Sequence, residues 1–267
     1  MVAFNDPLTD PPPEEVALER APLVCVIAQI RFSEVLAVAT DEFVAPFQQE
    51  ILSKYPLLTH GKVQQINFES SGSISTKTEK VWRFANLEST WTVSLAQTFL
   101  AIETSSYTSR ADFLARLREA VSALIEHVNP AVVDRLGVRY VDRISGEAVH
   151  QIRSLVRDEI CGIAGLPQFN QQDFSITENK FNLPHATLVA RWGQLAKNVG
   201  LDPLIIPALD SPSWILDLDM STLDHTSINV DVEAIINRAQ LFSERIYTFF
   251  RWVVTDDFLA FYGGEQQ

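Results

Sequence analysis

Arginine recurs at every fourth position of one predicted strand, a spacing that could bind anions. The segment Val132–Ile144 alternates in polarity as a β-strand does, which places Arg135, Arg139 and Arg143 on one face. At a rise of about 3.3 Å per residue, successive arginines lie about 13 Å apart and form a row rather than a single clamp. Because guanidinium groups bind carboxylates and phosphates through paired hydrogen bonds, the row predicts a site for an anionic ligand.

The same row has a structural interpretation, in which the arginines pair with carboxylates of a neighbouring strand or helix. A second predicted strand, Trp214–Met220, carries Asp217 and Asp219 on one face and apolar side chains on the other. Two carboxylates on one face are suited to acid–base or metal chemistry, and they are also common on the wet face of an amphipathic strand. The arginines and the aspartates could also neutralise one another, which would make both sets structural.

No catalytic signature accompanies these residues in the sequence. The chain has no phosphate-binding glycine loop, no G-x-S-x-G motif and no H-E-x-x-H motif. Its histidines are too far apart in sequence to form a local metal pair; they are His60, His127, His150, His185 and His225. We therefore predict no catalytic residue, no metal site and no cofactor.

Composition limits the classes of partner. The chain has 267 residues, of which 46% are hydrophobic, and a formal net charge of −13, so it can build a large core but lacks the basic surface of a general nucleic-acid-binding protein. Its two cysteines, Cys25 and Cys161, suit a reducing compartment. The segment from Met1 to Pro13 lacks the features of a signal peptide, and no apolar run reaches the roughly 20 residues of a membrane span. These features predict a cytoplasmic protein without a membrane segment.

The clearest predicted element is a helix that follows Ser109. Ser109 is a suitable N-cap residue, and Asp112 follows three positions later in a capping-box-like arrangement. Apolar residues then recur at steps of three and four as far as Val128, which gives one apolar stripe. The helix is expected to end at Asn129, because the residue before Pro130 is disfavoured in the α region.

The remaining elements predict an α+β fold with two pseudo-repeated halves. Each half has the order β-α-β-β-β-(β)-α, with antiparallel sheets covered by long helices. The halves span residues 21–130 and 131–267, after a flexible, Pro-rich leader at 1–20, and they could together form one continuous domain. The expected elements are strands at 22–32, 63–69, 81–84, 91–95, 99–104, 132–144, 172–179, 186–195 and 214–220, helices at 41–55, 147–160 and 232–254, a polar turn at 70–80, surface connections at 162–170 and 200–212, and a final turn capped by Thr255.

Several of these segments together resemble a known family. They are Ala21–Leu23, Gln29–Phe32, Tyr55–Pro56, Trp82–Phe84, Trp91–Leu95, Phe99–Thr104, Tyr107–Arg110, Asp112–Phe113 and Arg135–Val141. Their pattern is similar to that of a sporadically distributed family of uncharacterised bacterial proteins of about this length, for which no activity is established. The resemblance covers about the first 145 residues well and the C-terminal helix loosely. A patchy distribution implies an accessory gene, as in defence or toxin–antitoxin cassettes.

The function that these features favour is binding without catalysis. The missing catalytic motifs, the acidic charge and the family resemblance indicate an interaction protein that holds a partner protein on a sheet face or in a groove between the halves. A homo-oligomer is a further expectation. The alternative is a protein or enzyme that binds a small anionic ligand through Arg135, Arg139 and Arg143. Nucleic-acid binding through the same arginines is disfavoured by the net charge.

Overall fold

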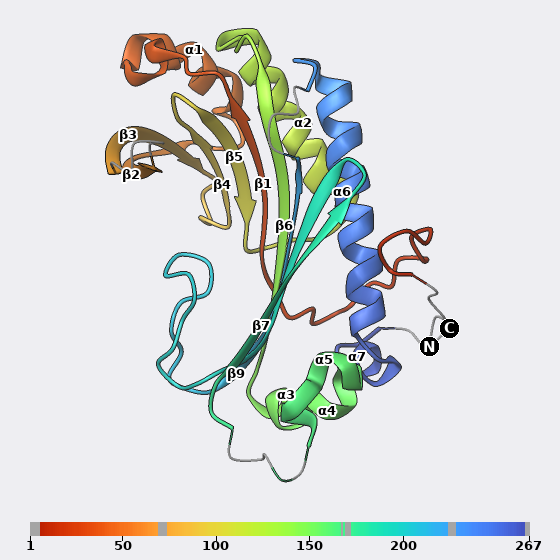
Figure 1. The fold of residues 1–267 in the computed structure, drawn as a ribbon. Coiled ribbons are helices and arrows are strands. Elements are labelled where there is room, and N and C mark those ends of the chain that lie inside the picture. The colour runs from red at the N-terminus through yellow and green to blue at the C-terminus, as the bar shows by residue number, and fades with distance from the viewer. Residues whose placement is uncertain (1–5, 69–73, 167, 169–171, 224–227, 265–267) are drawn as a thin grey trace. The chain divides into compact units, whose positions relative to one another are not determined.

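The computed structural model describes residues 6–68, 74–166, 168, 172–223 and 228–264, and within them the chain is α+β (Figure 1). The strands form one sheet in the order β2-β3-β4-β5-β1-β6-β9-β8-β7. Their bounds are β1 Leu23–Phe32, β2 Leu57–Phe68, β3 Ile74–Ala85, β4 Trp91–Leu95, β5 Phe99–Thr104, β6 Val133–Ser145, β7 Ser175–Leu183, β8 Ala186–Leu195 and β9 Ser213–Thr222. The α-helices are α1 Asp41–Ile51, α2 Arg110–His127, α3 Glu147–His150, α4 Ile152–Leu155, α5 Asp158–Cys161, α6 Val232–Val253 and α7 Asp256–Phe261, with short 3-10 helices at Leu36–Ala39 (η1) and Gly162–Gly165 (η2).

The chain divides into two compact units. Unit 1 comprises Met1–Val26, Val138–Ser221 and Leu241–Gln267, and unit 2 comprises Ile27–Gly137 and Thr222–Gln240. Four elements, β1, β6, β9 and α6, therefore contribute residues to both units, β9 by its last residue alone. The expected α+β class and antiparallel pairing are confirmed, with β2/β3, β3/β4, β4/β5 and β7/β8 all antiparallel.

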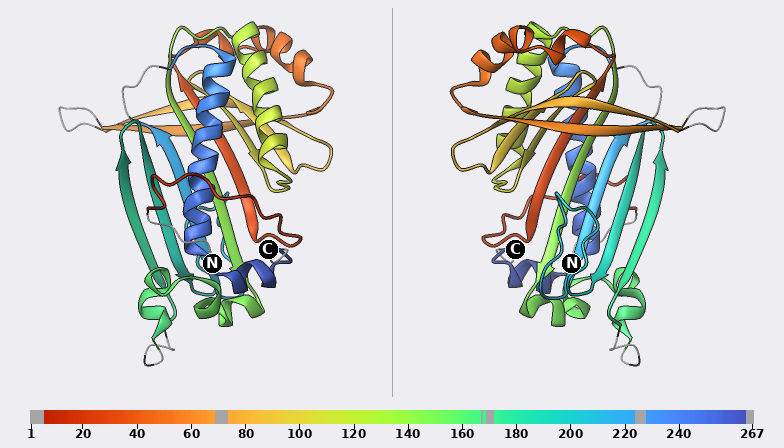
Figure 2. Two further views of the ribbon diagram at one scale, coloured as in Figure 1. Left: turned by 90° about the vertical axis from the view of Figure 1, so that its right-hand side faces the viewer. Right: turned by 90° about the vertical axis from the view of Figure 1, so that its left-hand side faces the viewer.

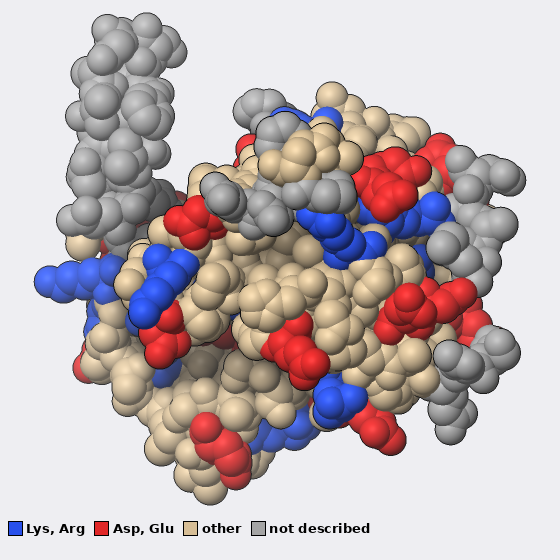
Figure 3. Space-filling model, turned by 90° about the horizontal axis from the view of Figure 1, so that it is seen from below, with Lys and Arg blue, Asp and Glu red and all other residues tan. Residues whose placement is uncertain are grey.

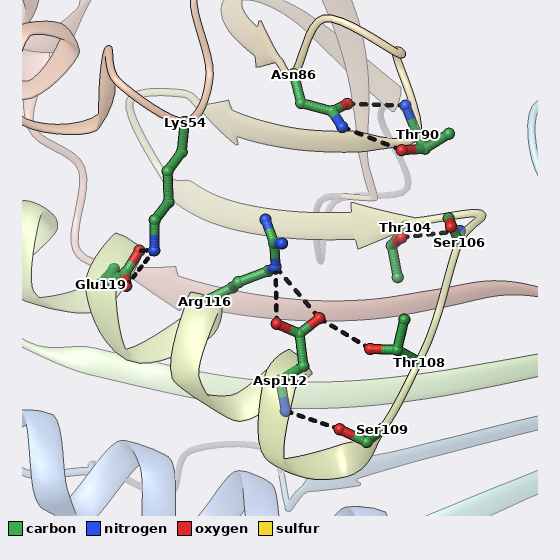
Figure 4. Close-up of polar contacts among 10 residues, drawn as sticks. All are labelled: Lys54, Asn86, Thr90, Thr104, Ser106, Thr108, Ser109, Asp112, Arg116 and Glu119. Atoms are coloured by element: carbon green, nitrogen blue, oxygen red, sulfur yellow. Dashed lines mark hydrogen bonds and ion pairs between the residues drawn. The ribbon is translucent and has the colours of Figure 1, made fainter. Parts of the chain in front are cut away.

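In unit 2, α2 forms at the predicted place. The Ser109 side chain accepts a hydrogen bond from the backbone N–H of Asp112 at 3.1 Å, and the Asp112 carboxylate accepts from Arg116 one turn later (Figure 4). Phe113 of α2 packs against Trp91 of β4, with ring centroids 5.9 Å apart. An ion pair between Lys54, which follows α1, and Glu119 of α2 adds a polar contact, with Nζ–Oε1 of 2.5 Å (Figure 4).

The polar turn expected at 70–80 is wrong over its described residues. β3 begins at Ile74 and pairs with β2 along its whole length, from Leu57↔Ala85 to Phe68↔Ile74; residues 70–73 lie outside the described residues. Only Trp82–Ala85 of β3 also pairs with β4, so most of the hairpin is a two-stranded ribbon (orange in Figure 2). Threonines in this segment favour strands despite their polarity, so polarity alone is a poor sign of a turn.

In unit 1, the single helix expected at 147–160 is also wrong. Three one-turn helices, α3, α4 and α5, take its place. The backbone leaves the helical region at Gln151 (φ −104°, ψ 8°) and becomes extended at Val156, which forms an isolated antiparallel bridge with Val254. A β-branched residue that finds a strand partner far away in sequence thus overrides the helical spacing.

The long helix α6 and the N-terminal segment also meet in unit 1. Phe249 of α6 packs against Phe181 of β7, with ring centroids 5.7 Å apart. Of the predicted leader, residues 1–5 lie outside the described residues, and residues 6–20 form no helix or strand. The leader backbone is bound by α6: Tyr247 accepts from Val16 N–H at 2.8 Å, and Arg245 donates to the carbonyl of Asp10 at 2.8 Å.

Candidate functional site

Four neighbouring strands of unit 1 each contribute one charged side chain to a row of alternating sign. The strands are β6, β9, β8 and β7, and the side chains are, in that order, Arg139, Asp217, Arg191 and Glu178. Arg139 binds Asp217 through two hydrogen bonds, Nε–Oδ1 of 2.7 Å and Nη2–Oδ2 of 2.9 Å. Arg191 donates to Oδ2 of Asp217 at 3.0 Å and, through Nη2, to Oε2 of Glu178 at 2.6 Å. We call these four residues the charge row.

The centre of the charge row is the most buried part of it. The side chain of Asp217 is 3% exposed, whereas that of Glu178, at the sheet edge, is 55% exposed. Burial acts to lower the pKa of Arg139, but the hydrogen bonds to Asp217 and the negative charges of Asp217, Asp219 and Asp202 outweigh it, so the pKa lies above the ordinary value. Arg139 is therefore a permanent cation whose charge is met by carboxylates.

Arg143 lies on the same face of β6 and has a different partner set. It donates from Nε to the Ser213 hydroxyl at 3.1 Å and from Nη1 to the carbonyl of Pro207 at 2.6 Å. Burial lowers its pKa below the ordinary value. Its Nη2 is buried and has no hydrogen-bond partner among the described residues.

Both arginines of this face thus contact the connection between β8 and β9, residues 196–212. Arg139 Nη1 lies 3.6 Å from a carboxylate oxygen of Asp202, and Arg143 binds the carbonyl of Pro207. Figure 2 (right) shows the connection in cyan in front of the unit 1 strands. The arginines that the sequence suggested for a ligand therefore hold a segment of the chain itself.

The connection is irregular, as its prolines predict, and it is closed on itself. Asn198 N–H donates to the carbonyl of Leu209 at 2.6 Å, which joins the two ends, and Ile206 N–H donates to the carbonyl of Asp202 at 2.7 Å. Compact segments of roughly 6–16 residues with joined ends are Ω-loops, which are often functional. We refer to residues 198–209 as the Ω-loop.

Gly200 is required for this closure. A Cβ at this position would lie 2.6 Å from the carbonyl oxygen of Ile206 and 2.8 Å from the amide nitrogen of Ala208. Both contacts are with backbone, which cannot move aside without opening the loop. The close approach of the two strands of the loop therefore depends on the absence of a side chain at Gly200.

The Ω-loop has an inner and an outer side. On the inner side, Ile206 is fully buried against Val141, Leu195 and Ile215 of the sheet. On the outer side, Leu204 is 84% exposed. The other exposed apolar residues of this side are Leu201, Pro203, Pro207 and Ala208. An ordered loop thus presents several apolar residues to solvent.

The remaining predicted site residues lie elsewhere. Arg135 belongs to unit 2, where its guanidinium lies over Gly137, 3.0 Å from where a Cβ would be. Asp219 follows Asp217 on β9, and its negative charge acts on Arg139. The sequence did not indicate Arg191, Glu178 or Asp202, because their place beside Arg139 and Asp217 depends on strand pairing and on the fold of the Ω-loop.

Surface charge and metal ligands give no competing site in the described residues. On the face drawn in Figure 3, basic and acidic side chains are interspersed, and neither sign forms a continuous field among the residues shown in colour. Within the described ranges, no three His, Cys, Asp or Glu side chains gather in a way that could hold a metal ion. Nor does any helix there combine the length and apolar character needed to cross a bilayer.

Comparison with known proteins adds no assignment. No protein-family model matches the chain, and no curated protein matches it either. The resemblance to a family of uncharacterised bacterial proteins therefore stays a prediction from the sequence.

Proposed function

We propose that the chain is an interaction protein that binds a partner protein through the outer side of the Ω-loop. The observation that supports this proposal is the combination of order and exposure in one segment. The loop is tied by backbone hydrogen bonds and by two arginines, yet Leu204 at its tip is 84% exposed. Apolar side chains exposed together on an ordered segment are a feature of binding sites.

Preorganisation makes the Ω-loop suited to binding. A partner that captures a mobile loop must offset roughly 0.5–1.5 kcal/mol for each side chain that becomes ordered. Here the Arg143–Pro207 bond and the packing of Ile206 fix the backbone before any partner arrives. A partner with an apolar pocket for Leu204 would then gain roughly 1.5–3 kcal/mol from its burial.

Site-specific photo-crosslinking tests the proposal. A photoreactive phenylalanine analogue replaces Leu204 in one chain and Leu87 in a matched control chain, because Leu87 is also an exposed leucine (72%) but lies in a turn of unit 2. In an extract of the cells that produce the protein, we expect a discrete protein adduct at position 204 only. Excess wild-type chain should compete it away, and a chain with Leu204→Asp should not.

Three results would contradict partner binding by the loop. They are no adduct at position 204, an equal adduct at position 87, and equal competition by wild-type and Leu204→Asp chains. The thermal midpoint of Leu204→Asp should stay within about 2 °C of wild type, because exposed substitutions of this kind change stability by roughly 0.5 kcal/mol or less.

A second candidate function, binding of a small anion, is supported by one atom. Nη2 of Arg143 is a buried donor with no hydrogen-bond partner in the described part of the chain. If an anion binds there, a panel of phosphate-bearing metabolites should raise the thermal midpoint of wild type, and Arg143→Ala should abolish the shift. Arg135→Ala in unit 2 is the control and should keep it; a shift that survives Arg143→Ala rules this candidate out.

We also propose that the chain consists of two structurally related halves, as the sequence predicts. We infer two related halves, each with a long helix over its strands, from the order of strands. The sheet reads β5-β4-β3-β2 outward from β1 and β9-β8-β7 outward from β6. In chain order, the last strand of each series is followed by a long helix: α2 follows β5, and α6 follows β9. An accessory role in a bacterial defence or toxin–antitoxin-like system is proposed on the sequence resemblance alone.

A further inference from the structure

The strands of unit 1 end at β7, whose outer edge has no strand partner among the described residues. β7 is the last strand in the sheet order, and Figure 2 shows it at the margin of the unit 1 strands. It has nine residues, Ser175–Leu183, and none of them is proline. An unpaired edge of this length offers main-chain N–H and C=O groups to a further strand, so it is a surface for β-strand addition.

The pairing of β7 with β8 fixes which main-chain groups point to the free edge. Leu183 and Ala186 lie opposite each other on either side of the two-residue turn between the strands, so they exchange hydrogen bonds. Because bonding alternates along an antiparallel strand, the odd-numbered residues of β7 bond to β8 and the even-numbered ones direct N–H and C=O away from it. The outward groups belong to Ile176, Glu178, Lys180 and Asn182.

Two of these residues carry opposite charges on one face of the strand. Glu178 and Lys180 are both exposed and are two positions apart, so their side chains point to the same face. Glu178 is the end of the charge row, where it accepts from Arg191. Lys180 forms no hydrogen bond or ion pair within the described part of the chain. The charge row therefore ends in a carboxylate at the free edge, beside a lysine that has no partner in its own chain.

A second copy of β7 is complementary to this edge. When two copies lie antiparallel with Asn179 opposite Asn179, Glu178 of each copy lies opposite Lys180 of the other. Asn179 is the middle residue of the strand, so this register pairs the whole of β7. It also sets the outward groups of one copy against those of the other, which gives about eight main-chain hydrogen bonds.

The same two charges disfavour other registers. A shift of two residues would place Glu178 opposite Glu178 or Lys180 opposite Lys180, and like charges that face each other across strands are destabilising. A shift of one residue would set outward main-chain groups against groups already bonded to β8. A lysine on an edge strand commonly prevents pairing, whereas here the glutamate two positions away favours one self-pairing register.

We propose that the chain forms a symmetric dimer through β7, in which the two edge strands pair antiparallel about Asn179. The unit 1 strands of both copies then belong to one sheet, and Lys180 of the second copy continues the alternation of sign that ends at Glu178. The match of β7 with itself, in charge and in length, is the reason to assign a second copy of this chain rather than a strand of another protein. Such an interface closes after two chains, so no free edge remains at β7.

The register also accounts for an exposed aromatic residue beside the strand. Phe174, directly before β7, is 50% exposed. In the proposed dimer it lies opposite Pro184 in the β7–β8 turn of the second copy, so each end of the strand pair gains an apolar contact. The dimer rests on β7 and the proposed function rests on the Ω-loop, so either proposal can fail without the other.

The mass of the full chain in solution, measured by light scattering during size exclusion, tests the dimer. Wild type should have twice the mass of one chain, which is 30.0 kDa. Lys180→Glu places two carboxylates opposite each other on both sides of Asn179, so the dissociation constant of the dimer should rise at least about tenfold. Lys197→Glu changes the net charge equally at an exposed lysine outside β7 and should leave the dissociation constant unchanged.

Disulfide formation between two chains tests the register. Asn179 is opposite itself in a pair that exchanges no hydrogen bonds, where Cα atoms lie about 4.5 Å apart and a disulfide can form. Asn179→Cys should therefore link two chains under mild oxidation, above the level of wild type, which has Cys25 and Cys161. Thr177→Cys is the control, because Thr177 lies opposite Phe181 and two such cysteines would be more than about 13 Å apart.

Three outcomes would overturn the dimer. One is the mass of a single chain for wild type at about 100 μM, which requires no variant and is also the result expected if β7 pairs with a strand of another protein. Another is a dimer whose dissociation constant is unchanged in Lys180→Glu. The third is a disulfide that forms equally well at positions 177 and 179, because the two strands would then have no fixed register.

Discussion

Two buried aspartates of unit 1 differ in how their negative charge is compensated. Asp217 on β9 is 3% exposed and meets two guanidinium groups, those of Arg139 and Arg191. Asp142 on β6 is 7% exposed, and burial alone raises the pKa of its carboxyl, to about 7. The first carboxylate is neutralised by its neighbours on the sheet, whereas the second is stabilised only by holding its proton. Burial alone therefore does not define the role of an acidic residue; the residues on adjacent strands do.

The comparison also concerns the stability of unit 1. Arg139 joins the paired carboxylate to Asp202 of the Ω-loop, so the charge row supports a segment that must be rigid for binding. At Asp142, burial is the one cause that raises the pKa of the carboxyl, and no cation lowers it. We expect substitutions at the two positions to change stability in opposite directions.

The largest effect is expected for Asp217→Asn. The substitution leaves Arg139 and Arg191 without their shared carboxylate at a buried position, and removal of one member of a buried pair costs about 3–5 kcal/mol. We expect a loss of about 3 kcal/mol in the free energy of unfolding, measured by urea denaturation, because Arg191 is partly exposed. Glu178→Gln, which removes the exposed end of the charge row, is the control and should cost less than about 1 kcal/mol.

Asp142→Asn should stabilise the chain at neutral and higher pH. Because the pKa of Asp142 is raised from 3.8 to about 7 on folding, its contribution to stability is full below about pH 4 and is lost as the pH rises to about 7. A gain of about 1–2 kcal/mol is expected at pH 8, reduced from the full linkage value by the unpaired amide that replaces the acid. Urea denaturation at pH 8 and pH 4.5 checks this; an equal gain at both pH values would show that ionisation is not the cause.

Gly200→Ala should have a smaller and local effect. Its Cβ would meet the backbone at Ile206 and Ala208, and overpacking of this kind costs about 1–3 kcal/mol. We expect the crosslink at position 204 to weaken severalfold while the sheet stays folded by circular dichroism. Gly61→Ala is a control for loss of glycine, since a Cβ at this position would meet only the guanidinium of Arg83, the far end of a flexible side chain. An undiminished crosslink in Gly200→Ala would show that the loop conformation does not matter for binding.

The elements predicted best are those whose signals are local. Ser109 caps α2 as expected, and Thr255 caps α7 by accepting a hydrogen bond from Phe258 N–H at 3.2 Å. The alternation of Trp91–Leu95 and the helical stripe of Val232–Val253 are also local, and both elements form as predicted. A cap or a stripe is complete within a few turns of chain, so no distant partner can overrule it easily.

The elements predicted wrongly depend on distant partners. Val156 becomes extended because Val254 pairs with it, and the polar residues after Ile74 form a strand because β2 lies alongside. The pairing of Arg139 with Asp217 was open to prediction as a mutual neutralisation of two charged sets. The contact of Arg191 with Asp217 could not be predicted, because the sequence of neither strand shows how β8 aligns beside β9. The burial of Asp142 could be predicted from the sequence, because this acid lies between Tyr140 and Ile144 on one face of a strand.

The most direct test of the Ω-loop as a preorganised binding element is the exchange of its own amides. In wild type, the amides of Asn198 and Ile206, which donate to Leu209 and Asp202, should exchange at least about tenfold more slowly than in the chain with both Arg139→Ala and Arg143→Ala. Amides of α2 in unit 2 should be equally protected in both chains. Rapid exchange of Asn198 and Ile206 in wild type, or protection that survives the loss of both arginines, would contradict the claim that these arginines hold the loop ready for a partner.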